Sequence, residues 1–282
     1  MDNKTTLLSN ITNALATPDQ VKRSHMTGLS PSSVSVLHFT GASLIQVAGA
    51  ILKLPNHVLT TACVLFHRFH LKVGFFDHSI QDSAAACLFV ASKVGEAVQS
   101  PGQVLAGIMT AVQDPLAIAN RKIVSHDVGH ASTQQLYDSE LQVLTSLAFD
   151  THVVSPHALC LQYIDAIKID ARNEQDVTQR AWNYLNDALR TRIYILHQPH
   201  AVAITAIWLA ARELNVELLD GQKWWEAFDV DTEDMGHILL LLREERDIGE
   251  SERRRATNGR LPPLTVDDVV ARVRQDIPTH VA

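Results

Sequence analysis

The chain has 282 residues, of which 46% are hydrophobic and 20% charged, and its formal net charge is −7. This composition is ordinary for folded proteins, and it excludes a chain that is disordered throughout, a fibre and a collagen-like array. A chain with a net negative charge is poorly suited to bind nucleic-acid phosphates, which are usually bound by clustered Lys and Arg. We therefore expect a protein or small-molecule partner and no direct binding to nucleic acid.

The cysteines and the apolar segments indicate in which cellular compartment the protein is expected. Cys63, Cys87 and Cys160 show no CxxC spacing, which predicts buried, reduced thiols in an intracellular protein. The first ten residues lack the apolar segment of a secretory signal. The stretch Leu29–Leu52 has no Asp, Glu, Lys or Arg, but it holds five serines, a His and a Gln. Because these groups would make membrane insertion costly, we predict a buried helix there and no membrane association.

Helical periodicity dominates the chain. After a partly ordered leader, residues 1–32, Ser32 or Ser33 is expected to cap a helix that runs to about Leu54. Pro55 is expected to open the next helix as a first-turn proline. Further helices are predicted at 79–97, 103–113, 132–147, 156–168, 176–195, 199–215 and 232–245, with a short turn at 223–228. Residues 249–282 are predicted to form a charged tail with one short helix at 266–274.

An internal repeat organises these helices. A shift of 119 residues superimposes two pairs of helices without a gap. The shift pairs Val58 with Val177, Ala62 with Ala181, Ala84 with Ala203, and Lys93 with Arg212. The repeated unit would have about five helices around an Ala-rich third helix, whose small side chains let its neighbours pack closely.

Several segments resemble the cyclin family. CLFVASKVGEA at 87–97 resembles the third helix of the cyclin box, which usually ends LASKxEE. GASLIQVAGAILKLPNHVLTTACVLFHRF at 41–69 is similar to the first two helices of the transcription-associated cyclins, especially the L type. ELQVLTSLAFD at 140–150 is similar to the family's fifth helix, and RAWNYLNDALRT at 180–191 to L- and K-type cyclins. KWWEAF at 223–228 is closer to the K type.

The resemblance covers about residues 22–245 and implies an all-α fold of two tandem five-helix cyclin boxes. The first box would span residues 33–151 and bind a kinase, and the second would span residues 152–248. It further implies a regulatory subunit, not itself an enzyme, with no cofactor and no metal. Such a subunit would bind and activate a cyclin-dependent serine/threonine kinase in the nucleus, in RNA polymerase II transcription or RNA processing.

The resemblance also assigns the kinase-binding residues. In the family, the Lys that closes the third helix and a Glu in the fifth helix hydrogen-bond the kinase, and these residues are Lys93 and Glu140 here. Glu96 matches the second Glu of KxEE, but Gly95 replaces the first, which is expected to loosen the end of the helix. The remaining candidates for this surface are Val94, Phe89 and Leu144. Core packing is an equal alternative for Phe89 and Leu144.

Other residue patterns favour packing over chemistry. His67 and His70 in HRFH lie on one helix face and could share a metal, but no HExxH motif accompanies them. The four tryptophans at 182, 208, 224 and 225 are interpreted as packing residues rather than a ligand cage. Neither a GxxxxGKS phosphate loop nor a GxSxG nucleophile elbow is present, so no catalytic residues are predicted.

A general transcription factor like factor IIB is the alternative from a different class, since its core also has two cyclin-like repeats and binds DNA. The net charge of −7 and the lack of paired cysteines disfavour it. HFTGASLIQ at 38–46 stands where cell-cycle cyclins carry their MRAIL-like docking helix, so a substrate-docking role of that type is not expected. No arginine-serine-rich tail precedes Ala282, so a role with RNA polymerase II is favoured over a direct link to splicing.

Overall fold

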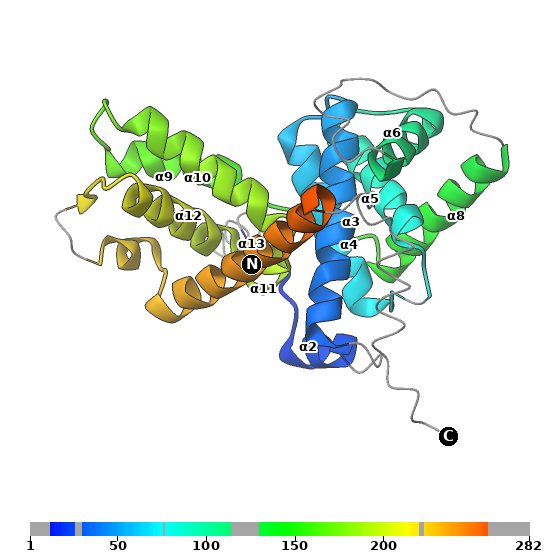
Figure 1. Ribbon diagram of the computed structural model, residues 1–282, viewed down its shortest axis with the longest axis horizontal. Helices are drawn as coiled ribbons and strands as arrows, with labels where there is room; N and C mark the ends of the chain where they lie inside the picture. Colours follow the sequence, from blue (N-terminus) through cyan, green and yellow to red (C-terminus); the bar gives the residue numbers. More distant parts are fainter. Residues whose placement is uncertain (1–11, 26–29, 76, 114–129, 220–222, 259–282) are drawn as a thin grey trace, which may run out of the picture. The chain divides into compact units, whose positions relative to one another are not determined.

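The computed structural model describes residues 12–25, 30–75, 77–113, 130–219 and 223–258, and every regular element in these ranges is helical (Figure 1). The predicted all-α class is therefore confirmed. Contacts group the residues into two units. The first unit is Ala16–His152 with the described residues from Asp247 on, and the second unit is Val153–Arg246 with Thr12–Leu15. The leader expected at residues 1–32 is thus divided between the two units.

The first unit is a bundle around one central helix. Its helices are α2 (Pro18–His25), α3 (Pro31–Ile51), α4 (Asn56–Lys72), α5 (Ile80–Val94), α6 (Pro101–Gln113) and α8 (His130–Ser146). Helix α5 contacts α3, α4, α6 and α8 (Figure 1), and its residues from Ser83 to Ser92 are all buried. Its run of alanines explains this position, because small side chains admit neighbouring helices on every side.

Helix α3 is long and apolar enough to cross a membrane by length and composition alone. Its apolar side chains, however, pack inside the bundle, and Leu37, Ile45 and Ala48 are almost completely buried. This placement agrees with the buried helix that the sequence predicts between Leu29 and Leu52.

Three helices begin at a proline where the sequence did not lead us to predict a helix start. Ser30, not Ser32 or Ser33, caps α3, and its Oγ accepts a hydrogen bond from the Ser33 N–H at 3.1 Å. Helix α6 begins at Pro101 rather than at 103, because the Ser100 hydroxyl accepts from the Gln103 N–H at 3.3 Å. Thr17 caps the unpredicted α2 in the same way, with Gln20 bonding back to the Thr17 N–H at 2.8 Å. Each start combines a capping hydroxyl with a first-turn proline.

Close contact between α3 and α4 depends on Gly41. A Cβ atom at this position would lie 2.0 Å from Cζ of Phe66, whose ring is fully buried. The absence of a side chain at Gly41 therefore sets how closely the two helices can approach.

We expect Gly41→Ala to lower the free energy of unfolding by about 1–3 kcal/mol, because the packed ring of Phe66 cannot move aside without strain. Gly102→Ala is the matched control: nothing lies within 4 Å of its added Cβ, and alanine favours helix by up to about 1 kcal/mol. Urea denaturation followed by circular dichroism compares the two. Equal stabilities of the variants would contradict the packing explanation.

The second unit also surrounds a central helix. Its elements are α9 (Pro156–Ile167), α10 (Glu174–Ala188), α11 (Ile193–Leu196), α12 (Pro199–Glu213), η2 (Trp224–Phe228) and the part of α13 (Thr232–Asn258) that ends at Arg246. Helix α12 contacts α9, α10, α11 and η2 (Figure 1). Helix α13 continues well beyond the predicted end at 245, while the short helix predicted at 266–274 lies outside the described residues.

The single helix predicted at 176–195 is wrong, because the chain turns between Ala188 and Ile193. The Thr191 hydroxyl donates to the Ala188 carbonyl at 2.8 Å and accepts from the Ile193 N–H at 3.2 Å. These side-chain bonds replace the main-chain bonds that would have continued the helix.

The 119-residue correspondence holds for two pairs of helices. It places α5, Ile80–Val94, on α12, Pro199–Glu213, with identical bounds. The paired positions Val58/Val177, Ala62/Ala181 and Ala84/Ala203 are all completely buried. Both central helices also end with a cation over an aromatic ring: Lys93 lies 4.1 Å from the Phe89 ring centre, and Arg212 lies 5.1 Å from that of Trp208. These pairs are related by the same shift.

Asn13 holds the N-terminal segment within the second unit. Its amide Nδ2 donates to the Val154 carbonyl at 3.1 Å, and its Oδ1 accepts from the Val154 N–H at 2.7 Å. The Asn13 main chain pairs with the Gln198 side chain, through a donated bond of 3.0 Å and an accepted one of 3.1 Å. Val154 lies just before α9 and Gln198 immediately precedes α12, so Asn13 joins two helix starts.

Candidate functional site

The end of α5 and one face of α8 bring together the two charged residues that the family resemblance singled out. Nζ of Lys93 forms an ion pair with Oε1 of Glu140. The Lys93 side chain is 40% exposed and lies over the ring of Phe89, whereas Glu140 is only 13% exposed. The carboxylate therefore lies between the helices and holds the ammonium at the edge of the bundle.

Helix α8 presents two apolar stripes. Leu136, Val143 and Leu147 are buried. Tyr137 and Leu141, in contrast, are 44% and 58% exposed, and they lie four residues apart on another face of the helix. The sequence analysis did not assign either residue to a surface, although the spacing of Tyr137, Leu141 and Leu144 was a readable signal.

The remaining predicted site residues divide between surface and core. Val94 is exposed next to Lys93, and Leu144 is half-buried. Phe89 is 5% exposed and packs against Tyr137 with ring centres 6.1 Å apart, so it supports the surface from beneath. Glu96 is exposed beyond the end of α5. The candidate surface is defined here as Lys93, Val94, Tyr137, Glu140, Leu141 and Leu144.

Helix α5 ends in a tight cap immediately after Gly95, the position that departs from the family pattern. Glu96 has a left-handed φ of 54°. The Ala97 N–H bonds the Ser92 carbonyl at 2.9 Å, which is the signature of a tight C-terminal cap. A Cβ at Gly95 would lie 2.6 Å from Cγ2 of Val58. The glycine therefore permits the start of α4 to pack against the end of α5.

Two adjacent substitutions should change stability in opposite directions. Gly95→Glu, which restores the family residue, is expected to lower the free energy of unfolding by about 1–2 kcal/mol through the contact with Val58. Glu96→Gly is expected to raise it by up to about 1 kcal/mol, because glycine adopts the left-handed conformation without strain. Thermal denaturation of the two variants checks this, and a stabilising Gly95→Glu would refute the close-approach explanation.

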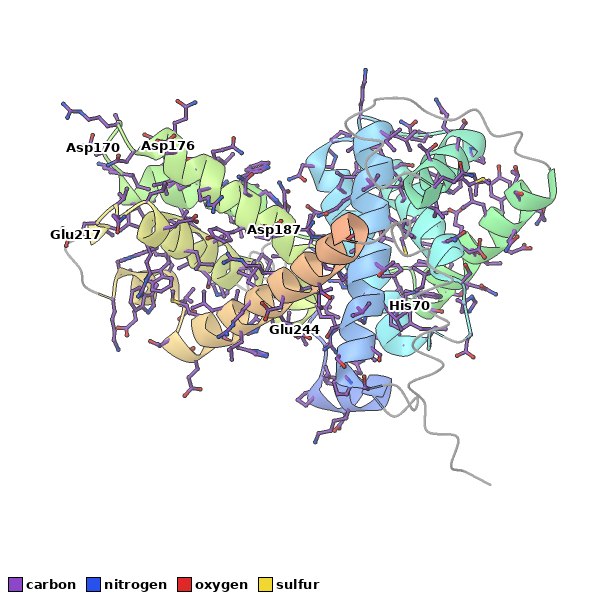
Figure 2. All side chains as sticks on the ribbon, in the orientation of Figure 1. His70, Asp170, Asp176, Asp187, Glu217 and Glu244 are labelled. Atoms are coloured by element: carbon purple, nitrogen blue, oxygen red, sulfur yellow. The ribbon has the colours of Figure 1, made fainter. Side chains whose placement is uncertain are left out.

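The histidines of HRFH belong to the core of the first unit. His70 (Figure 2) stacks on Phe75 with ring centres 4.1 Å apart, and its Nε2 shares a 2.8 Å hydrogen bond with the Ser83 hydroxyl. Burial, with His67 and His78 nearby, lowers the pKa of His70 to about 3. Nδ1 of His67 and Nδ1 of His38 are joined by a hydrogen bond of 2.9 Å. Among the described residues, no group of three His, Cys, Asp or Glu could hold a metal.

The cysteines and the tryptophans also occupy packing positions. Cys63, Cys87 and Cys160 are buried, and burial raises the pKa of Cys160 to about 12, which keeps its thiol protonated. Trp182 meets the buried His157 edge to face at 4.7 Å, and Trp224 is buried.

Comparisons with known proteins agree with these features. Residues 40–152 match the family model of the cyclin N-terminal domain. Human Cyclin-L1 is 34% identical over 214 residues, which are 76% of this chain and 40% of that protein. Human Cyclin-L2 is 30% identical over 265 residues, 88% of this chain and 50% of that protein. Cyclin L homolog cyl-1 of Caenorhabditis elegans is 33% identical over 230 residues, 76% and 48% respectively. The chain thus spans half or less of the length of these curated relatives.

Solved structures show the same fold. A chain of the yeast RNA polymerase II CTD kinase CTDK-1 complex superimposes with a TM-score of 0.65 at 17% identity, covering 94% of this chain and 84% of that chain. A chain of the CAK complex of Chaetomium thermophilum gives a TM-score of 0.56 at 18% identity, covering 96% and 76%. The helical bundle around α5, the match over residues 40–152 and these relatives lead to one conclusion: this chain carries a cyclin N-terminal domain and is a relative of the L-type cyclins.

Proposed function

We propose that this cyclin binds and activates a cyclin-dependent protein kinase through the candidate surface on α5 and α8. The observation that carries the proposal is the Lys93–Glu140 ion pair, flanked by the exposed apolar residues Val94 and Leu141. An apolar patch with fixed polar groups at its edge is the usual composition of a protein interface.

The chemistry of activation requires no catalytic group on this chain. A kinase is active when the Glu of one of its helices pairs with its ATP-binding Lys and its activation segment is open. A partner that packs against that helix selects the active arrangement. Lys93 would supply ammonium donors to kinase main-chain carbonyls, and Glu140 would fix the position of that ammonium.

We further propose that the complex acts in the nucleus, on the RNA polymerase II apparatus or in RNA processing. Support comes from the L-type relatives and from a structural neighbour that belongs to an RNA polymerase II CTD kinase complex. The polymerase-directed role and the nuclear location come from these likenesses and not from a feature of the surface itself.

The test is an affinity pull-down from native nuclear extract, followed by a kinase assay on a polymerase C-terminal repeat peptide. The wild-type chain should retain a cyclin-dependent kinase and support phosphorylation, while the purified chain alone should transfer no phosphate. Kinase activity in the rigorously purified chain would refute the proposal. A salt-sensitive micromolar complex with duplex DNA would instead favour the factor-IIB-like alternative.

A further inference from the structure

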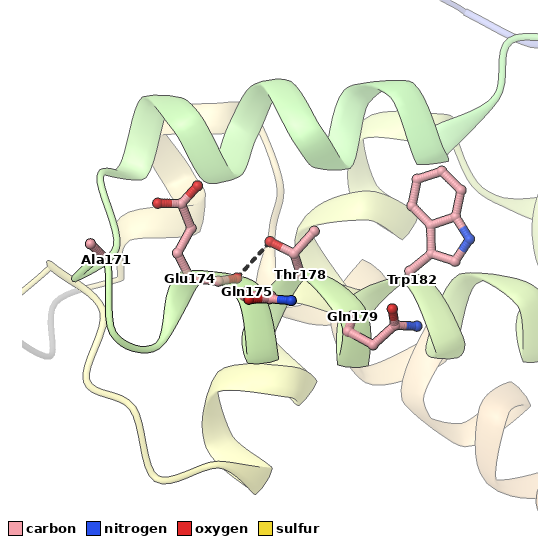
Figure 3. Close-up of a pocket in the computed structure, with 6 residues that line it drawn as sticks. All are labelled: Ala171, Glu174, Gln175, Thr178, Gln179 and Trp182. Carbon is pink, nitrogen blue, oxygen red and sulfur yellow. Dashed lines mark hydrogen bonds between the residues drawn. The ribbon is translucent and has the colours of Figure 1, made fainter.

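A furrow runs along one face of α10 in the second unit. Its volume is about 670 Å³, and it is lined by Ala171, Glu174, Gln175, Thr178, Gln179 and Trp182. These residues recur every three to four positions, so they form one face of the helix. Figure 3 shows the Glu174 carboxylate near the Ala171 end and the Trp182 indole at the opposite end.

The two ends of the furrow differ in chemistry. Glu174 supplies a carboxylate in the first turn of α10, and Trp182 supplies a half-buried aromatic ring fixed by its contact with His157. Between them lie polar side chains that are partly engaged with α10 itself. The Thr178 hydroxyl donates to the Glu174 carbonyl at 2.6 Å, and the Gln179 amide donates to Asn183 at 3.1 Å. The lining therefore offers one negative charge, one aromatic ring and amide groups.

The second unit as a whole is acidic. Residues 153–246 carry fifteen Asp and Glu against nine Lys and Arg, a net charge of −6 out of −7 for the whole chain. Asp170 and Asp176 flank Glu174 in sequence, near the junction of α9 and α10 (Figure 2), and Lys168 and Arg172 lie in the same segment. An acidic surface of this kind attracts a positively charged partner and repels an acidic one.

We propose that this furrow binds a basic peptide segment in an extended conformation, with one Lys or Arg against Glu174 and an Arg stacked on Trp182. The inference goes beyond the proposed kinase-binding function, because all the lining residues belong to the second unit. Charge complementarity selects a basic occupant, and the aromatic end selects arginine, whose planar guanidinium stacks on rings. The second unit already contains this pairing, with Arg212 5.1 Å from the Trp208 ring centre and Arg180 5.4 Å from that of Tyr184.

The spacing of the two ends sets the spacing of the basic residues. Glu174 and Trp182 are eight residues apart on one helix, a rise of roughly 12 Å. An extended peptide covers this distance in about four residues. The preferred segment therefore carries two basic residues separated by three or four positions, the second of them arginine.

The test measures fluorescence anisotropy of labelled peptides on the full chain at low salt. The probe is a glycine-flanked Arg-Ala-Ala-Ala-Arg peptide, compared with adjacent Arg-Arg and with Glu-Ala-Ala-Ala-Glu. We expect the first peptide to bind most tightly, and its affinity to fall as salt is raised, because exposed charge pairs are screened. Equal binding of the acidic peptide would overturn the proposal.

Three variants assign the binding to the furrow. Glu174→Gln should weaken binding about 2–5-fold, the range for an exposed charge pair. Gln175→Arg, which places a cation in the furrow at an exposed helical position, should weaken it about tenfold or more. Trp182→Phe should remove the binding-induced change in tryptophan fluorescence while retaining an aromatic ring against His157.

Glu233→Gln on α13 is the matched control, since it removes an exposed carboxylate of the same unit outside the furrow lining. It should leave binding unchanged. Unchanged binding in both Glu174→Gln and Gln175→Arg, or an equal loss in Glu233→Gln, would overturn the proposal. So would a dimer of this chain that Gln175→Arg dissociates, because the occupant would then be a second copy. None of these outcomes depends on whether the chain activates a kinase.

Discussion

Lys93→Ala and Glu140→Ala are each expected to weaken binding to the proposed partner kinase by roughly thirty- to several-thousand-fold. This range corresponds to ~2–5 kcal/mol, the cost of removing one partner from a charged group that is desolvated at an interface. Each variant breaks the ion pair that fixes the ammonium at the end of α5. Surface plasmon resonance with the captured kinase measures the loss, and the rate of peptide phosphorylation should fall in parallel.

The fold should be affected far less than the binding. The Lys93 side chain is 40% exposed, so water reaches the ammonium side of its ion pair in the free chain, although Glu140 is only 13% exposed. Exposed pairs of this kind contribute about 0–1 kcal/mol. Both variants should therefore keep a near-native melting temperature and the helical circular dichroism spectrum of the wild type.

Arg212→Ala is the internal control for this experiment. Arg212 corresponds to Lys93 under the 119-residue shift and also lies over an aromatic ring, Trp208, but it belongs to the second unit. Its truncation should leave kinase binding nearly intact. Normal binding by the Lys93→Ala and Glu140→Ala variants, or equal damage from Arg212→Ala, would show that the residue assignment is wrong even though the family is right.

Acidification from pH 7.5 to pH 5 is expected to destabilise each unit by about 2 kcal/mol through one buried histidine, about 4 kcal/mol in total. Burial lowers the pKa of His70 in the first unit to about 3. Burial also lowers the pKa of His157 in the second unit to about 4, against the opposing effect of its hydrogen bond to Asn186.

Acidification lowers the stability because burial lowers the pKa of both histidines. In the unfolded chain both histidines titrate near 6.5, so the unfolded state binds more protons than the folded state below that pH. The stabilising contribution is complete above about pH 6.5. It is lost progressively as the pH falls toward the folded pKa values of about 4 and 3.

Urea denaturation at the two pH values measures this loss of stability, and two variants show whether the two histidines cause it. His70→Gln and His157→Gln retain a hydrogen-bonding side chain toward Ser83 and Asn186 but cannot titrate. Each should reduce the pH-dependent difference by about 2 kcal/mol, whatever its effect on stability at neutral pH. An identical pH-dependent difference in the wild type and in both variants would contradict the assignment.

The sequence predicted the helical class and the central helices because these depend on local patterns. A run of alanines identifies α5, and the helical spacing of apolar residues locates the helices around it. The starts of α2, α3 and α6 were missed although each lies at a Ser-Pro or Thr-Pro pair, the same signal that was used correctly at Ser155-Pro156. The break after Ala188 was missed because Thr191 competes for main-chain groups only in the folded context.

The candidate site was reached through the family and not through periodicity. No local pattern indicates that Lys93 and Glu140 meet, because they lie 47 residues apart and on different helices. The resemblance brought them together, and the structure shows the ion pair. The spacing of Tyr137, Leu141 and Leu144 marks one face of α8, but whether that face is exposed depends on which face packs against α5, a property of the tertiary structure. The furrow on α10 was likewise invisible, since its Glu and Trp are eight residues apart.

Asn13 has a consequence for the order in which the chain can be assembled during synthesis. Its partners Val154 and Gln198 lie 141 and 185 residues further along the chain. The N-terminal segment therefore leaves the ribosome long before the helices it joins have been made, and it must wait while the whole first unit is translated. Closing so long a loop lowers the entropy of the chain, and the hydrogen bonds that offset this loss can form only once α9 and α12 exist. Asn13 is thus synthesised long before its partners Val154 and Gln198, but it can reach its final position only after both have been made.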